Sequence, residues 1–298
     1  MSSKKVVLIT GSSSGFGRLF TETLARKGYT VFATMRDPQG KNAKSAADLL
    51  ALAERESLPI YTLELEVTSD ASVENAVRAA IAQAGRIDVV INNAGYPIVG
   101  LSETVTTEQA QRLMDTNFFG PVRVNRAVLP HMRRQGSGLL MHISSGAGRI
   151  VIPAFTHYSA SKYALEALAE GYRYELASQG IDSVIVEPGA YETPIFGKTV
   201  VGSDASRAET YGAAAQIPEK INAVLAKSAG NAQEVADAIV RILETPSGQR
   251  KLRYRVSPSD LGVDAINEVS ERVQARVFEA FGISVETTFT QQKAAASD

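Results

Sequence analysis

Tyr158 and Lys162 are residues of a type and spacing that could together move a proton, and they begin and end the segment YSASK. Residues four apart share one face of a helix, so the phenol and the ammonium would lie side by side. A free tyrosine has a pKa near ~10, too high for acid–base work at neutral pH, and a neighbouring cation lowers that pKa by favouring the phenolate. The pair is therefore suited to proton transfer at an oxygen atom, although the same spacing also occurs in ordinary pairs on helix surfaces.

Further polar residues stand where short apolar runs of the sequence end. Ser145, the segment Asn92–Gly95 and the dipeptide Pro188-Gly189 each follow such a run, and Asn117 lies in the helix expected after Gly95. The carboxyl ends of parallel strands meet at one edge of a sheet, where ligands bind. We therefore expect these residues to converge with the tyrosine–lysine pair on one cleft.

The segment Thr10–Gly17 follows the first apolar run, Val6–Ile9, and opens a helix. Bare backbone N–H groups at a helix N-terminus bind phosphate, and glycines let the backbone approach it closely. The spacing G-x-x-x-G-x-G lacks the Lys-Ser/Thr of a nucleotide-hydrolysing loop, and an ordinary flexible loop is the alternative. The position between a strand and a helix favours dinucleotide binding by Gly11, Ser13, Ser14, Gly15, Phe16 and Gly17.

Arg36 follows the second apolar run, where the choice between the two nicotinamide dinucleotides is made. A carboxylate at this place binds a ribose 2′-hydroxyl, whereas an arginine accommodates a 2′-phosphate. The sequence therefore favours NADP(H), with NAD possible. The alternative is that Arg36 is a solvated loop residue paired with Asp37.

The expected elements alternate regularly between strand and helix. Nearly continuous apolar runs predict buried strands at Val6–Ile9, Thr30–Ala33, Ile60–Leu65, Ile87–Ile91, Gly138–Ile143, Ser183–Val186 and Lys251–Val256, with helical periodicity between them. Such alternation predicts an α/β fold, a Rossmann-type doubly wound parallel sheet of about seven strands with helices on both faces. We expect a single domain over residues 1–298, with a substrate lid at about 190–230 and a C-terminal extension at about 258–298.

The composition excludes several other classes of protein. With 298 residues, 44% of them hydrophobic, and a net charge of −1, the chain is neither a basic nucleic-acid binder nor a polybasic membrane protein. It contains no cysteine, which rules out disulfides and a thiolate nucleophile, and no apolar run reaches membrane-spanning length. We expect a soluble, cytoplasmic protein.

The histidines and one basic segment have ordinary structural explanations. His131, His142 and His157 lack metal-ligand spacing, so no metal site is predicted; His131 should be exposed and His142 packed in a strand. The segment Arg250–Arg255 alternates basic with apolar or aromatic side chains. We interpret it as the solvated face of an edge strand rather than a nucleic-acid contact.

Taken together, the motifs resemble the short-chain dehydrogenase/reductase family, in its single-domain branch. They occur in the family's order over residues 10–193, about two thirds of the chain: Thr10–Gly17, Glu66-Val67, Asn92–Gly95, Asn117, Ser145, Tyr158, Lys162, Pro188-Gly189 and Thr193. The C-terminal third is similar, more loosely, to the branch that contains hydroxysteroid and retinol dehydrogenases. The resemblance implies hydride transfer between a nicotinamide ring and a carbonyl or alcohol carbon.

The resemblance implies a role for each site residue. Ser145 would hydrogen-bond the substrate oxygen, Tyr158 pass the proton, Lys162 lower the pKa of Tyr158 and bind the nicotinamide ribose, and Asn117 hold a water that links Lys162 to solvent. Glu66 would face the adenine, where the family more often has aspartate. The implied cofactor-binding set is Gly11, Ser13, Ser14, Gly15, Phe16, Gly17, Arg36, Glu66, Val67, Asn93, Ala94, Gly95, Tyr158, Lys162, Pro188, Gly189 and Thr193.

The substrate and the partners follow from the same resemblance. Phe155, Tyr191, Ile195 and Phe196 fall where family members build the substrate wall, which implies a hydrophobic carbonyl or alcohol. A homodimer or homotetramer is the implied assembly, with no nucleic-acid or membrane partner. Two alternatives stay open: a dinucleotide-binding regulator or redox sensor without catalysis, and a sugar-nucleotide epimerase, which can share the tyrosine–lysine pair.

Overall fold

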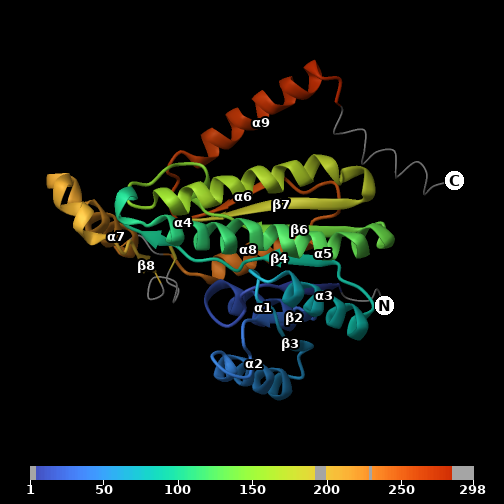
Figure 1. Ribbon diagram of the computed structural model, residues 1–298. Helices are drawn as coiled ribbons and strands as arrows, with labels where there is room; N and C mark the ends of the chain where they lie inside the picture. The colour runs from blue at the N-terminus through green and yellow to red at the C-terminus, as the bar shows by residue number, and fades with distance from the viewer. Residues whose placement is uncertain (1–4, 192–198, 228–229, 284–298) are drawn as a thin grey trace.

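The computed structural model describes residues 5–191, 199–227 and 230–283. Within these ranges seven parallel strands form one sheet in the order β3-β2-β1-β4-β6-β7-β9 (Figure 1). The strands are β1 (Val6–Ile9), β2 (Thr30–Met35), β3 (Ile60–Glu64), β4 (Val89–Asn92), β6 (Gly138–Ile143), β7 (Ile181–Pro188) and β9 (Arg253–Val256). The predicted doubly wound sheet is confirmed.

Helices cover both faces of this sheet. In the described ranges they are α1 (Gly15–Arg26), α2 (Ala43–Glu56), α3 (Asp70–Ala84), α4 (Thr107–Met114), α5 (Gly120–Gln135), α6 (Thr156–Glu175), α7 (Ile217–Lys227), α8 (Gln233–Glu244) and α9 (Val263–Ala280). Helices α1, α2 and α8 share one apolar cluster with the sheet, and α3, α5 and α6 share the other. Two buried layers of side chains therefore hold the sheet between the helices.

The strands read as continuous apolar runs because both of their faces are covered. Every residue of β1, β4 and β7 is buried. Strand β7 begins two residues before the apolar run Ser183–Val186, at Ile181, because Asp182 is buried in an ion pair with Arg173. The hydrophobicity of the segment alone places Asp182 outside the strand, because the ion pair with Arg173 of the preceding helix, α6, is not visible in it.

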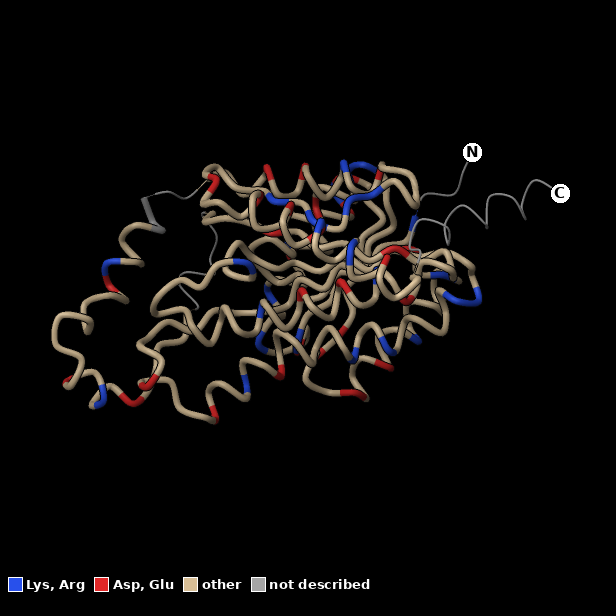
Figure 2. Tube along the Cα trace, turned by 90° about the horizontal axis from the view of Figure 1, so that it is seen from above, with Lys and Arg blue, Asp and Glu red and all other residues tan. Residues whose placement is uncertain are grey.

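The region 190–230 leaves the sheet and returns to it. Strand β8 (Val200–Val201) pairs in parallel with β5 (Ile98–Val99), and a bridge between Tyr191 and Gly230 joins the two ends of the excursion. Helix α7 lies at the outer end of this region, away from the sheet (Figures 1 and 2). Two contacts therefore attach this region to the rest of the protein: the bridge between Tyr191 and Gly230, and the pairing of β8 with β5.

The basic segment before and within β9 corrects one prediction. Strand β9 is an edge strand, as expected, but Arg250 and Arg253 are only 5% and 6% exposed, so they do not form a solvated face. Arg250 pairs with Asp182, and Arg253 pairs with Glu166 at 3.3 Å. The two carboxylates come from β7 and α6. The alternation of basic and apolar residues within Arg250–Arg255 gives no sign of these partners.

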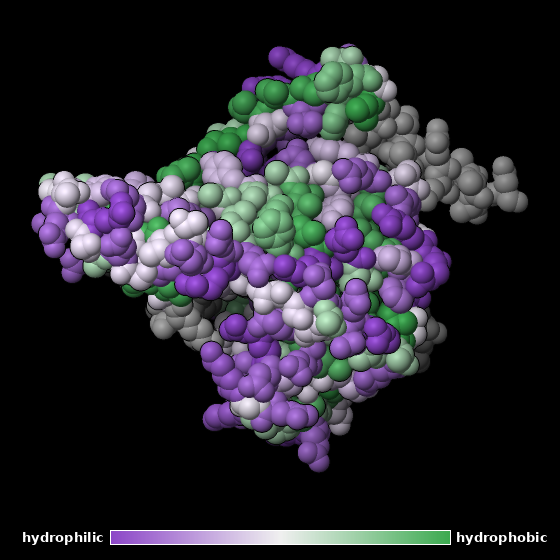
Figure 3. Space-filling model, in the orientation of Figure 1, coloured by the Kyte–Doolittle hydropathy of each residue, from purple (hydrophilic) through white to green (hydrophobic). Residues whose placement is uncertain are grey.

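Helix α9 covers β9 and the end of α6. The ring of Phe278 lies edge-on to that of Tyr174, with centroids 4.4 Å apart. Helix α9 also carries exposed apolar residues, and green atoms run along this helix in Figure 3; they are Ile266, Val269, Val273 and Val277. Among the described residues, none of the helices combines the length and the apolar character needed to cross a bilayer. Lys and Arg alternate with Asp and Glu along the trace in Figure 2.

Candidate active site

Thr10 and Asn93 join the turns that follow β1 and β4. The Thr10 hydroxyl accepts the backbone N–H groups of Asn93 and Ala94, both at 3.0 Å. In return, the Asn93 side-chain amide donates to the carbonyl of Thr10 at 2.9 Å and to that of Gly11 at 3.2 Å. The two turns are therefore locked together at the carboxyl edge of the sheet, as expected for a dinucleotide cleft.

The glycine turn requires glycine for steric reasons. Gly11 and Gly15 have φ values of +73° and +58°, a conformation that side chains disfavour. A Cβ on Gly17 would lie 2.3 Å from the Gly11 carbonyl oxygen, so α1 could not pack this closely with any other residue. Ser13 and Ser14 lie between these glycines, directly before α1. The turn therefore presents bare backbone at a helix N-terminus, which fits a dinucleotide phosphate.

Arg36 and Glu66 lie together beyond β2 and β3. Arg36 Nε is 3.5 Å from a Glu66 carboxylate oxygen, and 62% of the Arg36 side chain is exposed. The carboxylate of Asp37 instead accepts the backbone N–H of Lys41. Arg36 is thus solvated but paired with Glu66, not with Asp37. Val67 is buried against Gly120 at the start of α5.

Tyr158, Lys162 and Ser145 meet at the end of β6. Ser145 lies close enough to Tyr158 for its hydroxyl to lower the pKa of the phenol, and Lys162 Nζ lies 5.7 Å from the centre of the Tyr158 ring. Lys162 also donates to the carbonyl of Ile143 at 2.8 Å. Ser145 Oγ accepts the backbone N–H of Ala147, which orients the hydroxyl. The structure brings together the three residues that the sequence separates by up to 17 positions.

Burial has the largest effect on the pKa values of Tyr158 and Lys162. Burial raises the pKa of Tyr158 to about 12, and the hydrogen bond from Ser145 acts in the opposite direction. Burial lowers the pKa of Lys162 to about 8, while the charge of Glu166 raises it. Lys162 lies over the ring and donates to Ile143, and the lowering of the Tyr158 pKa that the resemblance implies for it stays a prediction.

Asn117 lies on a π-helical turn, Asp115–Phe119, and is buried. Its side chain donates to the carbonyl of Tyr96 at 3.1 Å and to Ser161 Oγ at 3.0 Å, and it accepts the Tyr96 N–H. Such turns often occur at functional sites, because the extra residue changes the direction of a side chain. Here the turn aims Asn117 at Ser161 of α6, between Tyr158 and Lys162 in the sequence.

The remaining predicted cofactor residues lie along the same edge. A Cβ on Gly95 would lie 3.0 Å from Asn117 Oδ1 and 3.7 Å from Lys162 Nζ, so Gly95 adjoins both. Pro188 ends β7, and Gly189 leaves no room for a side chain beside Ser257. Thr193 lies outside the described residues.

The predicted apolar wall is only partly found beside the tyrosine. Phe155 contacts Tyr158 edge-on, with ring centroids 6.2 Å apart, and shares a cluster with Ile217 and Ile221 of α7. Tyr191 does not belong to this wall. It is buried in the core and packs against Phe16, because the bridge to Gly230 turns it inward. Ile195 and Phe196 lie outside the described residues.

Three residues of the site were absent from the predicted set. Thr10 joins the two turns, Ser161 links Asn117 to the carbonyl of Tyr158, and Glu166 lies one helical turn after Lys162. The four-residue spacing of Glu166 from Lys162 is a signal that the sequence does contain. The described residues hold no group of three histidines or carboxylates that could bind a metal ion.

His142 is buried in β6 and belongs to a chain of amides behind the site. Its Nε2 accepts from the Asn125 side chain at 3.1 Å, and Asn125 in turn accepts from Asn92. Because the Asn125 amide nitrogen can only donate, the ring proton stays on Nδ1, which faces the carbonyl of Val184. His142 is therefore packed and hydrogen-bonded, as predicted, and burial lowers its pKa to about 4.

We expect this histidine to make the fold acid-sensitive. The folded-state pKa lies below the ordinary value of 6.5, so the unfolded chain takes up the proton first. Its contribution is complete above pH 6.5 and is lost as the pH falls toward 4, by about 3 kcal/mol at about 1.4 kcal/mol per pKa unit. Urea unfolding from pH 7.5 to 4 checks this, with His142→Gln as control. A stability difference between the two proteins that does not change with pH would contradict it.

Fold and site together define an NAD(P)-dependent oxidoreductase: a doubly wound sheet, a glycine turn at its first helix, and a serine, tyrosine and lysine at the same edge. The sequence model of the short chain dehydrogenases matches residues 5–203. The chain belongs to the short-chain dehydrogenase/reductase family.

Relatives and solved structures agree with this assignment. The chain is 36% identical to an uncharacterized oxidoreductase, YusZ, of Bacillus subtilis, over 85% of this chain and 89% of that protein. It is 34% identical to human retinol dehydrogenase 8, over 85% of this chain and 83% of that enzyme. A short-chain dehydrogenase structure from Streptomyces avermitilis is 34% identical, has a TM-score of 0.74, and covers 94% of this chain and 96% of its own.

Proposed function

We propose that this enzyme reduces a hydrophobic carbonyl compound with NADPH, reversibly, and that Tyr158 supplies the proton. The observation that carries the proposal is the contact between Tyr158 and Ser145 with Lys162 above the tyrosine ring. A phenol with a pKa of about 12 is protonated at neutral pH, which suits it to donate rather than to accept.

Each catalytic residue has one task in this proposal. Ser145 turns its one hydroxyl proton from Tyr158 to the carbonyl oxygen of the substrate, while its Oγ keeps accepting the Ala147 N–H. Tyr158 then gives its proton to the same oxygen. The positive charge of Lys162 stabilises the phenolate that remains, and Asn117 holds the neighbouring backbone of Tyr96 in place.

The cofactor would lie along the carboxyl edge of the sheet. Its phosphates would meet the turn with Gly11, Gly15 and Gly17, whose bare backbone fits such a group. When bound, the nicotinamide supplies or accepts the hydride. Arg36, exposed beyond β2, would contact the 2′-phosphate once it turns from Glu66.

Replacing Arg36 by Asp should change the cofactor preference toward NAD. A carboxylate at this position repels a 2′-phosphate and accepts hydrogen bonds from a 2′-hydroxyl. We expect kcat/KM for NADPH to fall by about 10- to 100-fold while that for NADH changes little or rises. Steady-state kinetics with both cofactors measures the ratio. An unchanged ratio would show that Arg36 does not read the phosphate.

The substrate class follows from the apolar side chains near Tyr158. Phe155, Ile217 and Ile221 lie in one cluster with the tyrosine, and a hydrophobic substrate would pack against them. Retinol dehydrogenase 8, a relative named for a lipid alcohol, supports this choice. In this proposal the 190–230 region is the lid of a single-domain enzyme, with residues from about 258 as its C-terminal extension.

The test is a screen of ketones, aldehydes, steroids and quinones with NADPH and with NADH, followed at 340 nm. Oxidation of the cofactor with a hydrophobic carbonyl, faster with NADPH, supports the proposal. Cofactor binding without turnover on any substrate would favour a dinucleotide-binding regulator instead. We further propose a cytoplasmic homodimer or homotetramer without nucleic-acid or membrane partners, which sedimentation and cell fractionation can check.

A further inference from the structure

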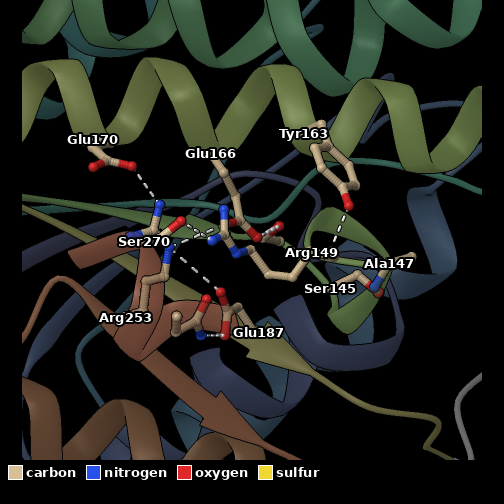
Figure 4. Close-up of polar contacts among 11 residues, drawn as sticks. Ser145, Ala147, Arg149, Tyr163, Glu166, Glu170, Glu187, Arg253 and Ser270 are labelled. Carbon is tan, nitrogen blue, oxygen red and sulfur yellow. Dashed lines mark hydrogen bonds and ion pairs between the residues drawn. The ribbon is translucent and has the colours of Figure 1, made fainter. Parts of the chain in front are cut away.

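Four ionisable side chains are buried together behind Ser145 (Figure 4). Arg149, Glu166, Glu187 and Arg253, here called the buried charge cluster, have side chains that are 12%, 2%, 0% and 2% exposed. Arg253 Nε lies 3.3 Å from Glu166 and 3.7 Å from Glu187, and Arg149 Nε lies 3.8 Å from Glu166. Burying four charged side chains costs desolvation energy, so this cluster does not follow from a gain in stability alone.

Glu166 is the member of this cluster that contacts the segment directly after β6, where Ser145 lies. Its Oε1 accepts a hydrogen bond of 2.7 Å from Ser144 Oγ, and Ser144 immediately precedes Ser145. Gly148, three residues on from Ser145, makes this contact possible, since a Cβ there would lie 2.4 Å from the same carboxylate oxygen. The carboxylate thus occupies the space inside the turn that Ser145 begins.

The same residue is tied to the catalytic helix by its position. Tyr158, Lys162 and Glu166 follow one another at four-residue intervals of α6, so they share one face. The charge of the Glu166 carboxylate raises the pKa of the Lys162 ammonium, against the effect of burial. One side chain therefore joins the helix that carries the tyrosine and lysine to the strand end that carries the serine.

Helix α9 closes the other side of the cluster. Ser270 accepts a hydrogen bond of 2.7 Å from Arg149, and Asn267 donates one of 2.8 Å to Glu187. Tyr163 of α6 donates to the backbone carbonyl of Arg149, which fixes the chain just after the Ser145 turn. The turn that contains Ser145 is therefore bonded on both sides: Glu166 binds Ser144 before it, and Tyr163 and Ser270 bind Arg149 after it.

We propose that Glu166 is a positioning residue of the active site, which sets the place of the Ser145 hydroxyl through Ser144 and keeps the Lys162 side chain charged. The inference rests on the proposed roles of Ser145 and Lys162. A displacement of a reacting group by about 1 Å can lower a rate about 10²-fold, so the contact to Ser144 has kinetic weight. A negative charge one helical turn away opposes the burial that lowers the pKa of Lys162.

Few other titratable groups face Lys162. Tyr158 is on its own helix, His142 comes from β6 and is neutral above pH 4, and Asn117 on the neighbouring π-turn carries no charge. Among the described residues, Glu166 is the one negative charge that acts on Lys162, and Arg253, which faces it from the far side, favours its ionised form although burial raises its pKa. Removing the Glu166 charge should therefore change the titration of Lys162 directly.

The experiment compares Glu166→Gln with Glu170→Gln. Both carboxylates pair with Arg253, but Glu170 lies one turn further along α6 and does not bond Ser144. The ¹³Cε chemical shift of Lys162 in lysine-labelled protein, assigned with Lys162→Arg, reports its titration without any substrate. We expect the midpoint to fall by about one pH unit in Glu166→Gln and to stay unchanged in Glu170→Gln. Equal midpoints in both variants would overturn the effect on Lys162.

A second variant tests the contact to the serine. Ser144→Ala removes the donor to Glu166 but leaves every charge in place. With NADPH and 9,10-phenanthrenequinone as the probe substrate, we expect kcat to fall about 10-fold or more, with the Lys162 midpoint unchanged. Wild-type kcat in Ser144→Ala would overturn the positioning of Ser145. If the wild-type enzyme reduces no carbonyl at all, the proposed function fails instead, and the titration of Lys162 still decides whether Glu166 acts on it.

Discussion

Replacing Tyr158 by Phe will lower kcat/KM for carbonyl reduction by about 10²- to 10⁴-fold, the usual contribution of a positioned general acid. The substitution removes one oxygen atom and leaves the ring, which packs against Phe155 and lies under Lys162. Folding and cofactor affinity should therefore stay close to those of the wild type. Steady-state kinetics gives the first quantity, and NADPH fluorescence gives the second.

Unchanged turnover in Tyr158→Phe is the result that would contradict this prediction. Wild-type turnover in the phenylalanine variant would show that another group supplies the proton, and the proposed mechanism would be wrong. Tyr174→Phe is the matched control, because this tyrosine is also on α6 and its hydroxyl donates to Glu170, away from the Ser145 turn. We expect that control to lose far less than Tyr158→Phe.

Gly17→Ala will abolish tight dinucleotide binding and destabilise the fold. The added Cβ would lie 2.3 Å from the carbonyl oxygen of Gly11 and 2.5 Å from the amide nitrogen of Asn93. Both belong to the hydrogen bonds that join the first and fourth strand turns, so relief of the clash must break them. We expect the NADPH Kd to rise about 10²-fold or more and the free energy of unfolding to fall by about 3 kcal/mol.

Gly171→Ala is the control for this substitution. Gly171 is in the middle of α6, and its added Cβ would have ordinary contact, 3.8 Å, with the Glu175 carboxylate. Alanine is the better helix former by about 1 kcal/mol, so this variant should be slightly more stable. Urea unfolding and NADPH titration of both variants measure the contrast. A Gly17→Ala protein that binds NADPH normally would disprove the close approach of the backbone.

The local chemistry of the site could be predicted because it depends on neighbours along the chain. The tyrosine–lysine spacing follows from helical periodicity, and the glycine turn follows from its place between β1 and α1. The ends of α3 depend on local chemistry in the same way, because Ser69 accepts the Ser72 N–H at its start and Gly85 ends it in a left-handed conformation.

The failed predictions concern contacts between distant segments. Arg250 and Arg253 look solvent-facing in their own strand and are buried by carboxylates from β7 and α6. Tyr191 was expected at the substrate and packs instead on Phe16 of α1. In each case the partner that decides the side chain's surroundings lies more than sixty residues away.

By itself the sequence determined the parallel sheet, the glycine turn and the pairing of Tyr158 with Lys162, because hydrophobic period and steric demand act over a few residues. Only the tertiary structure decided the pKa values of the pair and the contact of Glu166 with Ser144. Burial and charge depend on which segments meet in space, and chain-distant groups set both.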